Sequence, residues 1–317
     1  MPPALPSYPH ARPTPYHLML RTWSYAWWRP VTGMLLLLFG FFVAAPVAML
    51  PVVAVAAAFE KGSWSHNFAD TITLKRVDAG GLLYLNLTLA SMILVTWAIM
   101  RVLHNMRPRW LASVRPKIRW KFLFACLGIS VIALGASILV GSLLPASSGD
   151  NLNARLNHFT VATALVAVVV MLTTPLQAAG EEYAFRGYLM QAVGSLSKSK
   201  WFAILVTATV FALAHGGQNP PLFFDRFAFG LIAGWLVTYT GGLEAGIALH
   251  ILNNVLAFSL ALAFGNLATT VNVTSVSWWN IVNTVTQSGV YTVLVVVVAR
   301  KMGMRNTTSP PALEATE

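Results

Sequence analysis

The stretch from Phe159 to Val193 reads FTVATALVAVVVMLTTPLQAAGEEYAFRGYLMQAV, an apolar run with two acids and an arginine in its second half. Roughly 20 apolar residues are enough for a helix to cross a bilayer, and this run is longer. A charged group at bilayer depth is costly, so it is a functional hypothesis by default. The stretch therefore predicts a long membrane helix whose polar groups serve a function.

Apolar runs of this kind recur along the 317 residues, of which 56% are hydrophobic and 10% charged, whereas a soluble domain carries roughly a quarter charged residues. The runs lack the alternation of barrel strands, so they are expected to be helices. We predict an all-α membrane protein, a bundle of about eight transmembrane helices. The predicted spans are Val31–Phe59, Leu82–Leu103, Phe122–Leu144, Phe159–Val193, Trp201–His215, Phe227–Tyr239, Ala245–Phe264 and Val282–Ala299.

The charges are distributed unevenly between the links. Seven cations and no acid lie between Arg101 and Lys121, and further cations without acids precede the first span and follow the last. The links from Glu60 to Asp78 and from 145 to 158 carry acids and bases together. Cations on alternate links are the pattern of the positive-inside rule, which predicts cytoplasmic N and C termini. Because the net charge of +11 is explained in this way, we predict no nucleic-acid partner.

The chain is expected to divide into four parts. These are a cytoplasmic or interfacial segment (1–30), three accessory transmembrane helices (31–155), a core of later helices (156–301) and a disordered cytoplasmic tail (302–317). The three accessory helices carry almost no ionisable residue at bilayer depth, whereas the later spans do. The function is therefore expected in the core.

Glu182 and Arg186 are four residues apart, so on a helix they share a face and can pair. Such pairing offsets much of the cost of burying either charge alone. Glu181 is rotated by about 100° from Glu182 and faces elsewhere. Its carboxylate is therefore available, and it is a candidate general base.

Two later spans carry the other polar candidates. The fifth ends at His215, where the following Gly-Gly and Pro-Pro pairs stop the helix. In the seventh, His250 and Asn254 share one face, and Gly246, one turn earlier, allows another backbone or a substrate to approach closely. The polar faces of three helices are thus expected to converge on one cavity.

This convergence depends on the depth of Glu181. If the fourth helix ended near Ala179, Glu181 would lie at the cytoplasmic surface, far from His215. At about 1.5 Å per residue, continuing the helix to about Val193 brings Glu181 toward mid-depth. We therefore predict a long or tilted fourth helix, which Pro175 can kink.

The order Glu-Glu-x-x-x-Arg, Phe-x-x-x-His and His-x-x-x-Asn on late spans resembles one family. It is similar to the CPBP family, the CAAX-protease and bacteriocin-processing intramembrane proteases related to the type II CAAX prenyl endopeptidase. The resemblance covers about Phe159 to Phe264. Its matching residues are Glu181, Glu182, Arg186, Phe211, His215, His250 and Asn254.

The resemblance implies an endopeptidase of a bacterial plasma membrane that cleaves a membrane-embedded or lipid-anchored peptide. Glu181 and His215 would activate water, and His250 and Asn254 would stabilise the oxyanion. Glu182 and Arg186 would form a structural ion pair beside them. Whether the substrate is prenylated or a bacteriocin-type peptide stays open.

A metal is the alternative within this family. Glu181, His215 and His250 would make a plausible His2Glu zinc site with an open position. The chain has no His-Glu-x-x-His motif, and Asn254 suits an oxyanion donor better than a zinc ligand. We therefore expect a glutamate-dependent mechanism without a cofactor, with zinc as the alternative.

Other functions are compatible with the same residues. A transporter or proton-coupled carrier uses buried acids and histidines, and a non-catalytic bacteriocin-immunity protein can share the fold. Gly230 and Gly234 are expected only to pack the sixth helix. Three further charged residues are expected near span ends, where they reach water: Asp225, Arg226 and Glu244.

Overall fold

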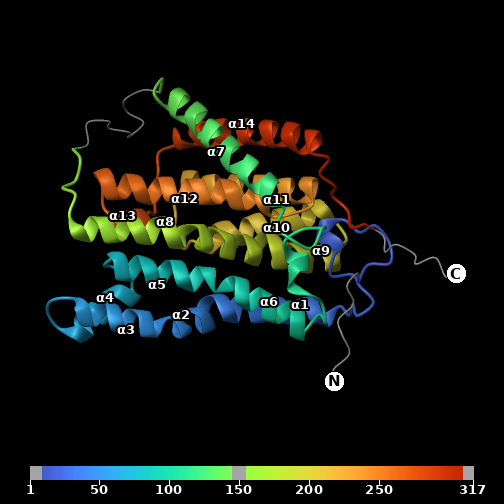
Figure 1. Ribbon diagram of the computed structural model, residues 1–317, viewed down its shortest axis with the longest axis horizontal. Coiled ribbons are helices and arrows are strands. Elements are labelled where there is room, and N and C mark those ends of the chain that lie inside the picture. Colours follow the sequence, from blue (N-terminus) through green and yellow to red (C-terminus); the bar gives the residue numbers. More distant parts are fainter. Residues whose placement is uncertain (1–8, 145–154, 310–317) are drawn as a thin grey trace.

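The computed structural model describes residues 9–144 and 155–309, and in these residues the chain is a bundle of helices without strands (Figure 1). Seven helical runs are long and apolar enough to cross a membrane, and one shorter apolar helix accompanies them. The predicted bundle of about eight helices is confirmed. The seven runs are Trp28–Phe59, Ala79–Val102, Trp120–Gly141, Val161–Ser197, Pro220–Thr240, Glu244–Phe264 and Asn280–Lys301.

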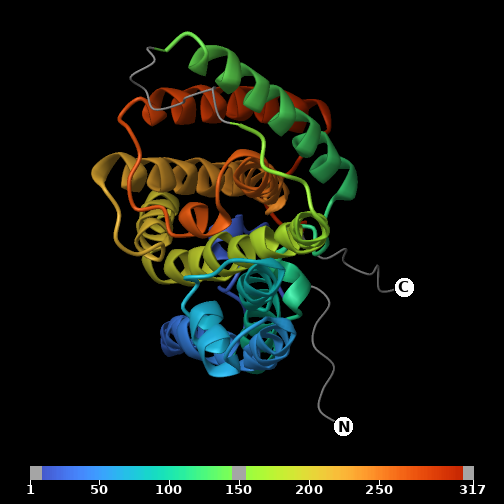
Figure 2. The same ribbon diagram turned by 90° about the vertical axis from the view of Figure 1, so that its left-hand side faces the viewer.

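The first two runs and the short helix between them form one layer of the bundle. This layer covers one side of the fourth run (Figure 2). The first run includes a π-helical segment (Gly40–Ala44), and the second consists of two consecutive helices. The elements are α1 (Trp28–Phe39), α2 (Ala45–Ala48), α3 (Leu50–Phe59), α4 (Trp64–Ile72), α5 (Ala79–Ala90) and α6 (Met92–Val102).

The fourth run is the longest and lies at the centre of the bundle (Figures 1 and 2). It consists of α8 (Val161–Glu182), a π-helical segment (Tyr183–Leu189) and α9 (Met190–Ser197). Thr160 caps its start by accepting a hydrogen bond from the Thr163 amide. The prediction that this helix continues through Arg186 to about Val193 is confirmed, and Pro175 lies inside α8 without ending it.

The later helices differ in length from their predicted spans. α10 (Lys200–Leu213) has 14 residues, about 21 Å at 1.5 Å per residue, which is short of a hydrocarbon core about 30 Å thick. α11 (Pro220–Thr240) begins earlier than predicted, because the Asn219 side chain caps it by accepting from the Leu222 amide. The remaining elements are α7 (Trp120–Gly141), α12 (Glu244–Phe264), α13 (Leu267–Val271) and α14 (Asn280–Lys301).

Small residues allow the helices around the site to approach closely. A Cβ on Gly180 would lie 2.1 Å from the Leu89 carbonyl oxygen, so α8 and α5 are almost in backbone contact. A Cβ on Gly230 would lie 2.8 Å from Cα of Ala208 in α10, and one on Gly234 would lie 3.0 Å from the Met190 side chain. The predicted packing role of Gly230 and Gly234 is confirmed.

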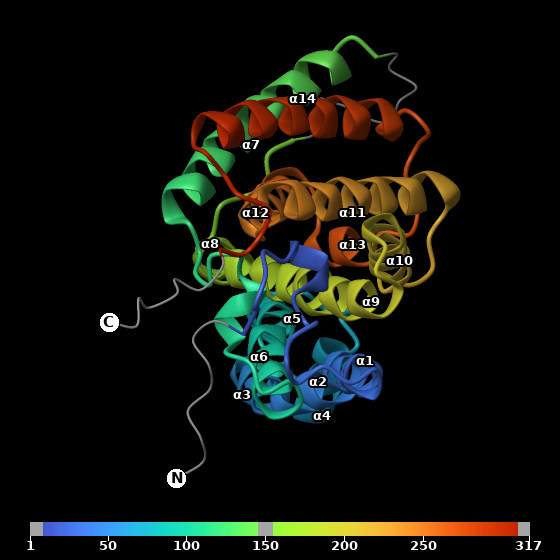
Figure 3. The same cartoon turned by 90° about the vertical axis from the view of Figure 1, so that its right-hand side faces the viewer.

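The two ends of the described chain meet at one end of the bundle (Figure 3). The Thr308 amide donates to the carbonyl of Thr14, and the Thr308 side chain is buried. The predicted disorder of the tail is therefore wrong for residues 302–309, because hydrogen bonds to the N-terminal segment hold them. Residues 310–317 and 1–8 lie outside the described residues.

This terminal face also carries most of the cations. Among the described residues, its one acid is Glu244, whereas on the opposite face Arg76 pairs with both Glu60 and Asp78. From the positive-inside rule we propose that the terminal face lies in the cytoplasm. Its cations are Arg12, Arg21, Arg29, Arg101, Arg107, Arg109, Arg115, Lys117, Arg119, Lys121, Lys198, Lys200, Arg300, Lys301 and Arg305.

The orientation can be measured with a matched pair of exposed lysines on the two faces. Cys126, the single cysteine, is fully buried and gives little background. A membrane-impermeant maleimide added to intact cells is expected to label Lys61→Cys, and to label Lys301→Cys only after permeabilisation. The reverse pattern would contradict the assigned orientation.

Candidate functional site

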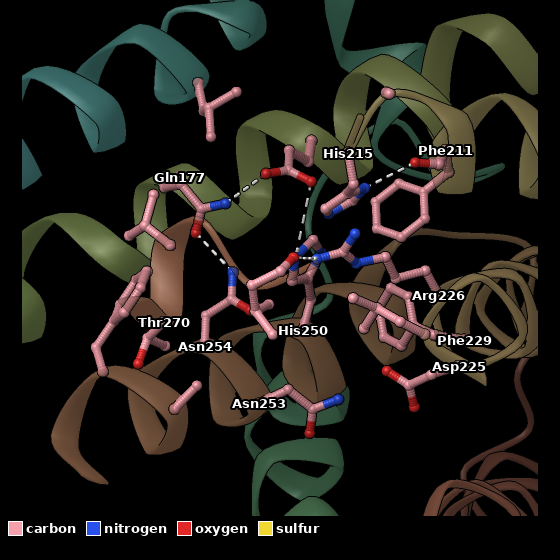
Figure 4. Close-up of a pocket in the computed structure, with 18 of the residues that line it drawn as sticks. Gln177, Phe211, His215, Asp225, Arg226, Phe229, His250, Asn253, Asn254 and Thr270 are labelled. Carbon is pink, nitrogen blue, oxygen red and sulfur yellow. Dashed lines mark hydrogen bonds and ion pairs between the residues drawn. The ribbon is translucent and has the colours of Figure 1, made fainter. Parts of the chain in front are cut away.

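A cavity of about 550 Å³ lies inside the bundle, between α8, α11, α12 and the layer of early helices (Figure 4). Its walls are apolar apart from a group of polar side chains. Leu74 and Val273, from loops on the face opposite the termini, line its outer end. The polar residues used below are Gln177, Glu181, His215, Arg226, His250 and Asn254.

Glu182 lies behind the cavity wall and has no exposed surface. Its Oε1 accepts hydrogen bonds from Arg186 Nη1 at 2.8 Å and from His250 Nδ1 at 3.0 Å. A Cβ on Gly246 would come within 2.6 Å of its Oε2, so the close approach predicted at this glycine is made by the Glu182 carboxylate. The predicted ion pair is confirmed, and it also fixes the orientation of His250.

Arg186 is held by aromatic rings as well as by Glu182. Its guanidinium carbon lies 4.0 Å from the ring centre of Phe211 and 5.1 Å from that of Phe229. Such cation–π contacts are stabilising, most of all where water is excluded. The Phe211 ring is also 4.8 Å from the His215 ring and 5.9 Å from the His250 ring, so this phenylalanine joins the three motifs.

Glu181 points to a different partner. It accepts a hydrogen bond from Gln177 Nε2, and its Oε2 lies 3.8 Å from His250 Nε2. Gln177 Oε1 in turn accepts from Asn254 Nδ2 at 2.9 Å (Figure 4). Because an ionised carboxylate only accepts, Glu181 fixes the direction of this chain, and Asn254 keeps a second amide N–H.

His215 lies just beyond α10, where Gly216 adopts a φ of +78° and the helix ends as predicted. Its Nδ1 lies 2.8 Å from the Phe211 carbonyl oxygen. A carbonyl can only accept, so Nδ1 carries the proton and Nε2 is the unprotonated nitrogen of the neutral ring. Glu181, His215, His250 and Asn254 all line the one cavity, so the predicted convergence is confirmed.

The comparisons with known proteins include a match to the part of the chain that holds these motifs. Residues 160–256 match the family described as "Type II CAAX prenyl endopeptidase Rce1-like", and this range holds every residue of the three motifs. This part of the chain is therefore similar to the Rce1-like family. The family is one of CAAX-type membrane proteases, in agreement with the resemblance drawn from the motifs.

One curated relative of the chain is "Uncharacterized protein YyaK" of Bacillus subtilis (strain 168). The two are 25% identical over 168 residues, which are 50% of this chain and 54% of the relative. The chain therefore matches about half the length of this relative, and its name states no activity.

Several residues of the candidate site were not predicted. Gln177 stands four residues before Glu181 on the same helical face, so spacing alone offered a signal. Phe229 faces Arg186 from α11, and nothing in its apolar surroundings distinguishes it. Arg226 and Asp225 line the cavity, contrary to the expectation that they lie near span ends and reach water.

The expectation that Glu244 reaches water is also wrong. Glu244 is fully buried at the start of α12, where Arg119 Nε donates to its Oε1 at 2.8 Å. The cationic link that identified the terminal face therefore supplies the partner of this acid.

The side chains proposed for zinc do not form a ligand set. Among the residues that the structure describes, no three His, Cys, Asp or Glu side chains come close enough to share a metal ion. The comparisons give the metalloprotease alternative no support.

The close approach at Gly246 gives a test of the Glu182 arrangement. Gly246→Ala is expected to displace the Glu182 carboxylate and lower the free energy of unfolding by about 1–3 kcal/mol, as overpacking does. Gly128→Ala in α7, whose Cβ would meet nothing within 4 Å, is the matched control and should leave the stability equal or slightly higher. Equal melting temperatures for the two variants in detergent would contradict the prediction.

Proposed function

We propose that this protein is an intramembrane endopeptidase that hydrolyses a peptide bond of a membrane-associated peptide. One observation carries the proposal. Glu181 on α8 and His215 just beyond α10 line one intramembrane cavity, while the neighbouring acid, Glu182, is bonded through Oε1 to Arg186 and His250. Glu181 is thus left to act on a substrate.

In the proposed reaction a water molecule binds between Glu181 and His215 Nε2. Glu181 removes a proton from the water, and the oxygen attacks the carbonyl carbon of the scissile bond. The C–N bond of the resulting tetrahedral intermediate then breaks. The leaving amine takes the proton from Glu181, and the newly formed carboxylic acid releases its own proton to the amine or to water. The products are a carboxylate and an amine.

The second amide N–H of Asn254 would donate to the oxyanion of this intermediate. His250 Nε2 would donate as well when the ring is an imidazolium, because Nδ1–H is already directed to Glu182. Each donor of this kind contributes about 10²- to 10³-fold in other enzymes. Glu182 and Arg186 would act by positioning His250.

The packing of the terminal face supports substrate entry from the other side. Tyr16 OH donates to the Leu111 carbonyl, and Arg21 Nε donates to the Ser195 carbonyl at 2.7 Å, so the N-terminal segment covers the end of α9. The outer end of the cavity, at Leu74 and Val273, lies on the opposite face. We infer a substrate that reaches the cavity from that face or from within the bilayer, the plasma membrane in a bacterial host.

Substitution of the proposed chemical pair tests this function. Glu181→Gln and His215→Ala are each expected to reduce cleavage of an acylated, internally quenched peptide in proteoliposomes by about 10²- to 10⁴-fold, as loss of a general acid or base does. Asp70→Asn and His66→Ala, a pair on α4 outside the site, are the controls. Unchanged cleavage in both site variants would exclude the assignment and leave a carrier or a non-catalytic immunity protein as the better function.

The absence of a three-ligand cluster among the described residues gives a separate prediction about zinc. The pure, active protein is expected to contain far less than one zinc ion per chain by elemental analysis. Its cleavage rate should not change after treatment with a strong chelator. Stoichiometric zinc, with activity lost on chelation and restored by zinc, would contradict this prediction and leave the peptidase proposal in place.

A further inference from the structure

The cavity has a second group of polar side chains, on the wall formed by α12 and α14. Asn253 stands on α12, and Gln287 and Ser288 stand on α14. Figure 4 shows that Asn253 and Asn254 leave α12 in different directions, Asn254 toward Gln177 and Asn253 away from it. The proposed reaction uses none of this second group, and residues 287 and 288 lie beyond the range that matches the family.

One hydrogen bond orients the two amides of this group. Gln287 Nε2 donates to Asn253 Oδ1 at 2.9 Å, so the Asn253 carbonyl and one N–H of Gln287 are engaged. Among the described residues, Gln287 Oε1, Asn253 Nδ2 and the Ser288 hydroxyl have no hydrogen-bond partner, and each keeps accessible surface. The group therefore offers donors and an acceptor to the cavity, but no charge.

Hydrogen bonds between side chains commonly join membrane helices, but here several polar atoms remain unused. A polar group without a partner in apolar surroundings costs about 1–3 kcal/mol, so these atoms require water or a ligand. A neutral group of donors and acceptors suits a neutral polar ligand. A side-chain amide carries the same donor and acceptor as a peptide group, so the pair of amides is complementary to a peptide backbone.

A peptide that enters the bundle for hydrolysis has the corresponding need. Hydrolysis requires access to the carbonyl carbon, so the backbone around that bond cannot remain in a regular helix. Its N–H and C=O groups then lose their helical partners, and inside the membrane each unsatisfied group is costly. The described residues contain no strand with which an extended peptide could pair. Side chains of the cavity must therefore supply these hydrogen bonds.

We propose that Asn253 and Gln287 bind the backbone of the substrate at one residue near the scissile bond. A peptide N–H would donate to Gln287 Oε1, and a peptide carbonyl would accept from Asn253 Nδ2. The inference rests on the proposed peptidase function and adds that the substrate is recognised here by its backbone, whatever its side chains.

The position of Asn253 indicates which substrate residue is bound. Asn253 is three residues after His250 on α12, about 4.5 Å along the helix axis. An extended peptide advances about 3.3 Å per residue. The residue bound by the two amides therefore lies one or two positions from the bond that is cleaved.

Equilibrium binding to the Glu181→Gln protein in lipid nanodiscs tests the proposal without turnover. The probes are N-dodecanoyl-Ala-Leu-Val-Leu-Ala-amide and five analogues, in each of which an ester oxygen replaces one backbone N–H. The ester keeps the length of the peptide but removes one donor. One or two analogues are expected to bind about 5- to 100-fold more weakly than the parent peptide, as leaving a buried acceptor unpaired does.

Three variants in the same background assign this difference to the amide pair. Gln287→Met removes the acceptor with little change in volume and is expected to abolish the difference. Asn253→Leu releases Gln287 from its orienting bond and should reduce the difference. Thr286→Val, the control, removes a hydroxyl from a neighbouring position of α14 outside the cavity wall and should retain the full difference. Melting temperatures show whether each variant is folded, and Asn253→Leu serves if Gln287→Met is not.

Equal affinities for the parent peptide and all five analogues, including no measurable binding of any, would overturn the proposal. A difference that persists undiminished in Gln287→Met, or is lost equally in Thr286→Val, would do the same. Because binding is measured without cleavage, a difference that requires Gln287 in a chain that hydrolyses nothing would refute the peptidase and leave the peptide-binding site. Cleavage that requires Glu181, with no such difference, would have the opposite meaning.

Discussion

The arrangement of the site depends on one carboxylate, that of Glu182, which has no contact with solvent. An isolated carboxylate at this depth would be strongly destabilising, and breaking a buried pair typically costs about 3–5 kcal/mol. Two groups offset this cost: Arg186, one turn later on the same helical run, and His250, on α12. Gly246 provides the space. Because Glu182 is bonded to both groups, it fixes the position of α8 relative to α12. It also orients His250 so that Nε2 faces the cavity.

The same arrangement separates two adjacent glutamates into different environments. Glu182 is buried between the packed helices, whereas Glu181 contacts a neutral amide, Gln177, and faces the cavity. The π-helical segment begins at Tyr183, directly after the two acids, and includes Arg186. Segments of this kind are frequent at functional sites, because they shift the faces of a helix relative to one another. Here the helix carries a structural pair and a reactive group on consecutive residues.

The sequence predicted the features that depend on local spacing and hydropathy. These are the membrane runs, the length of the fourth helix, the Glu182–Arg186 pair and the convergence of three motifs. It failed where distant contacts decide the outcome. Glu244 was placed in water because its partner, Arg119, stands on another link of the chain. α10 is short although its sequence is apolar, and the packed residues 302–309 depend on hydrogen bonds to Thr14. The role of Gln177 depends on Asn254, which only the folded chain brings near.

The place where the cavity reaches the protein surface determines which compartment supplies its water. Leu74 and Val273, which line the cavity, lie away from the cation-rich face. With that cationic face in the cytoplasm, as we propose, the substrate and the water that hydrolyses it would both come from the outer side of the membrane. The products would be released on that side, and the cytoplasm would not be exposed to the peptidase activity.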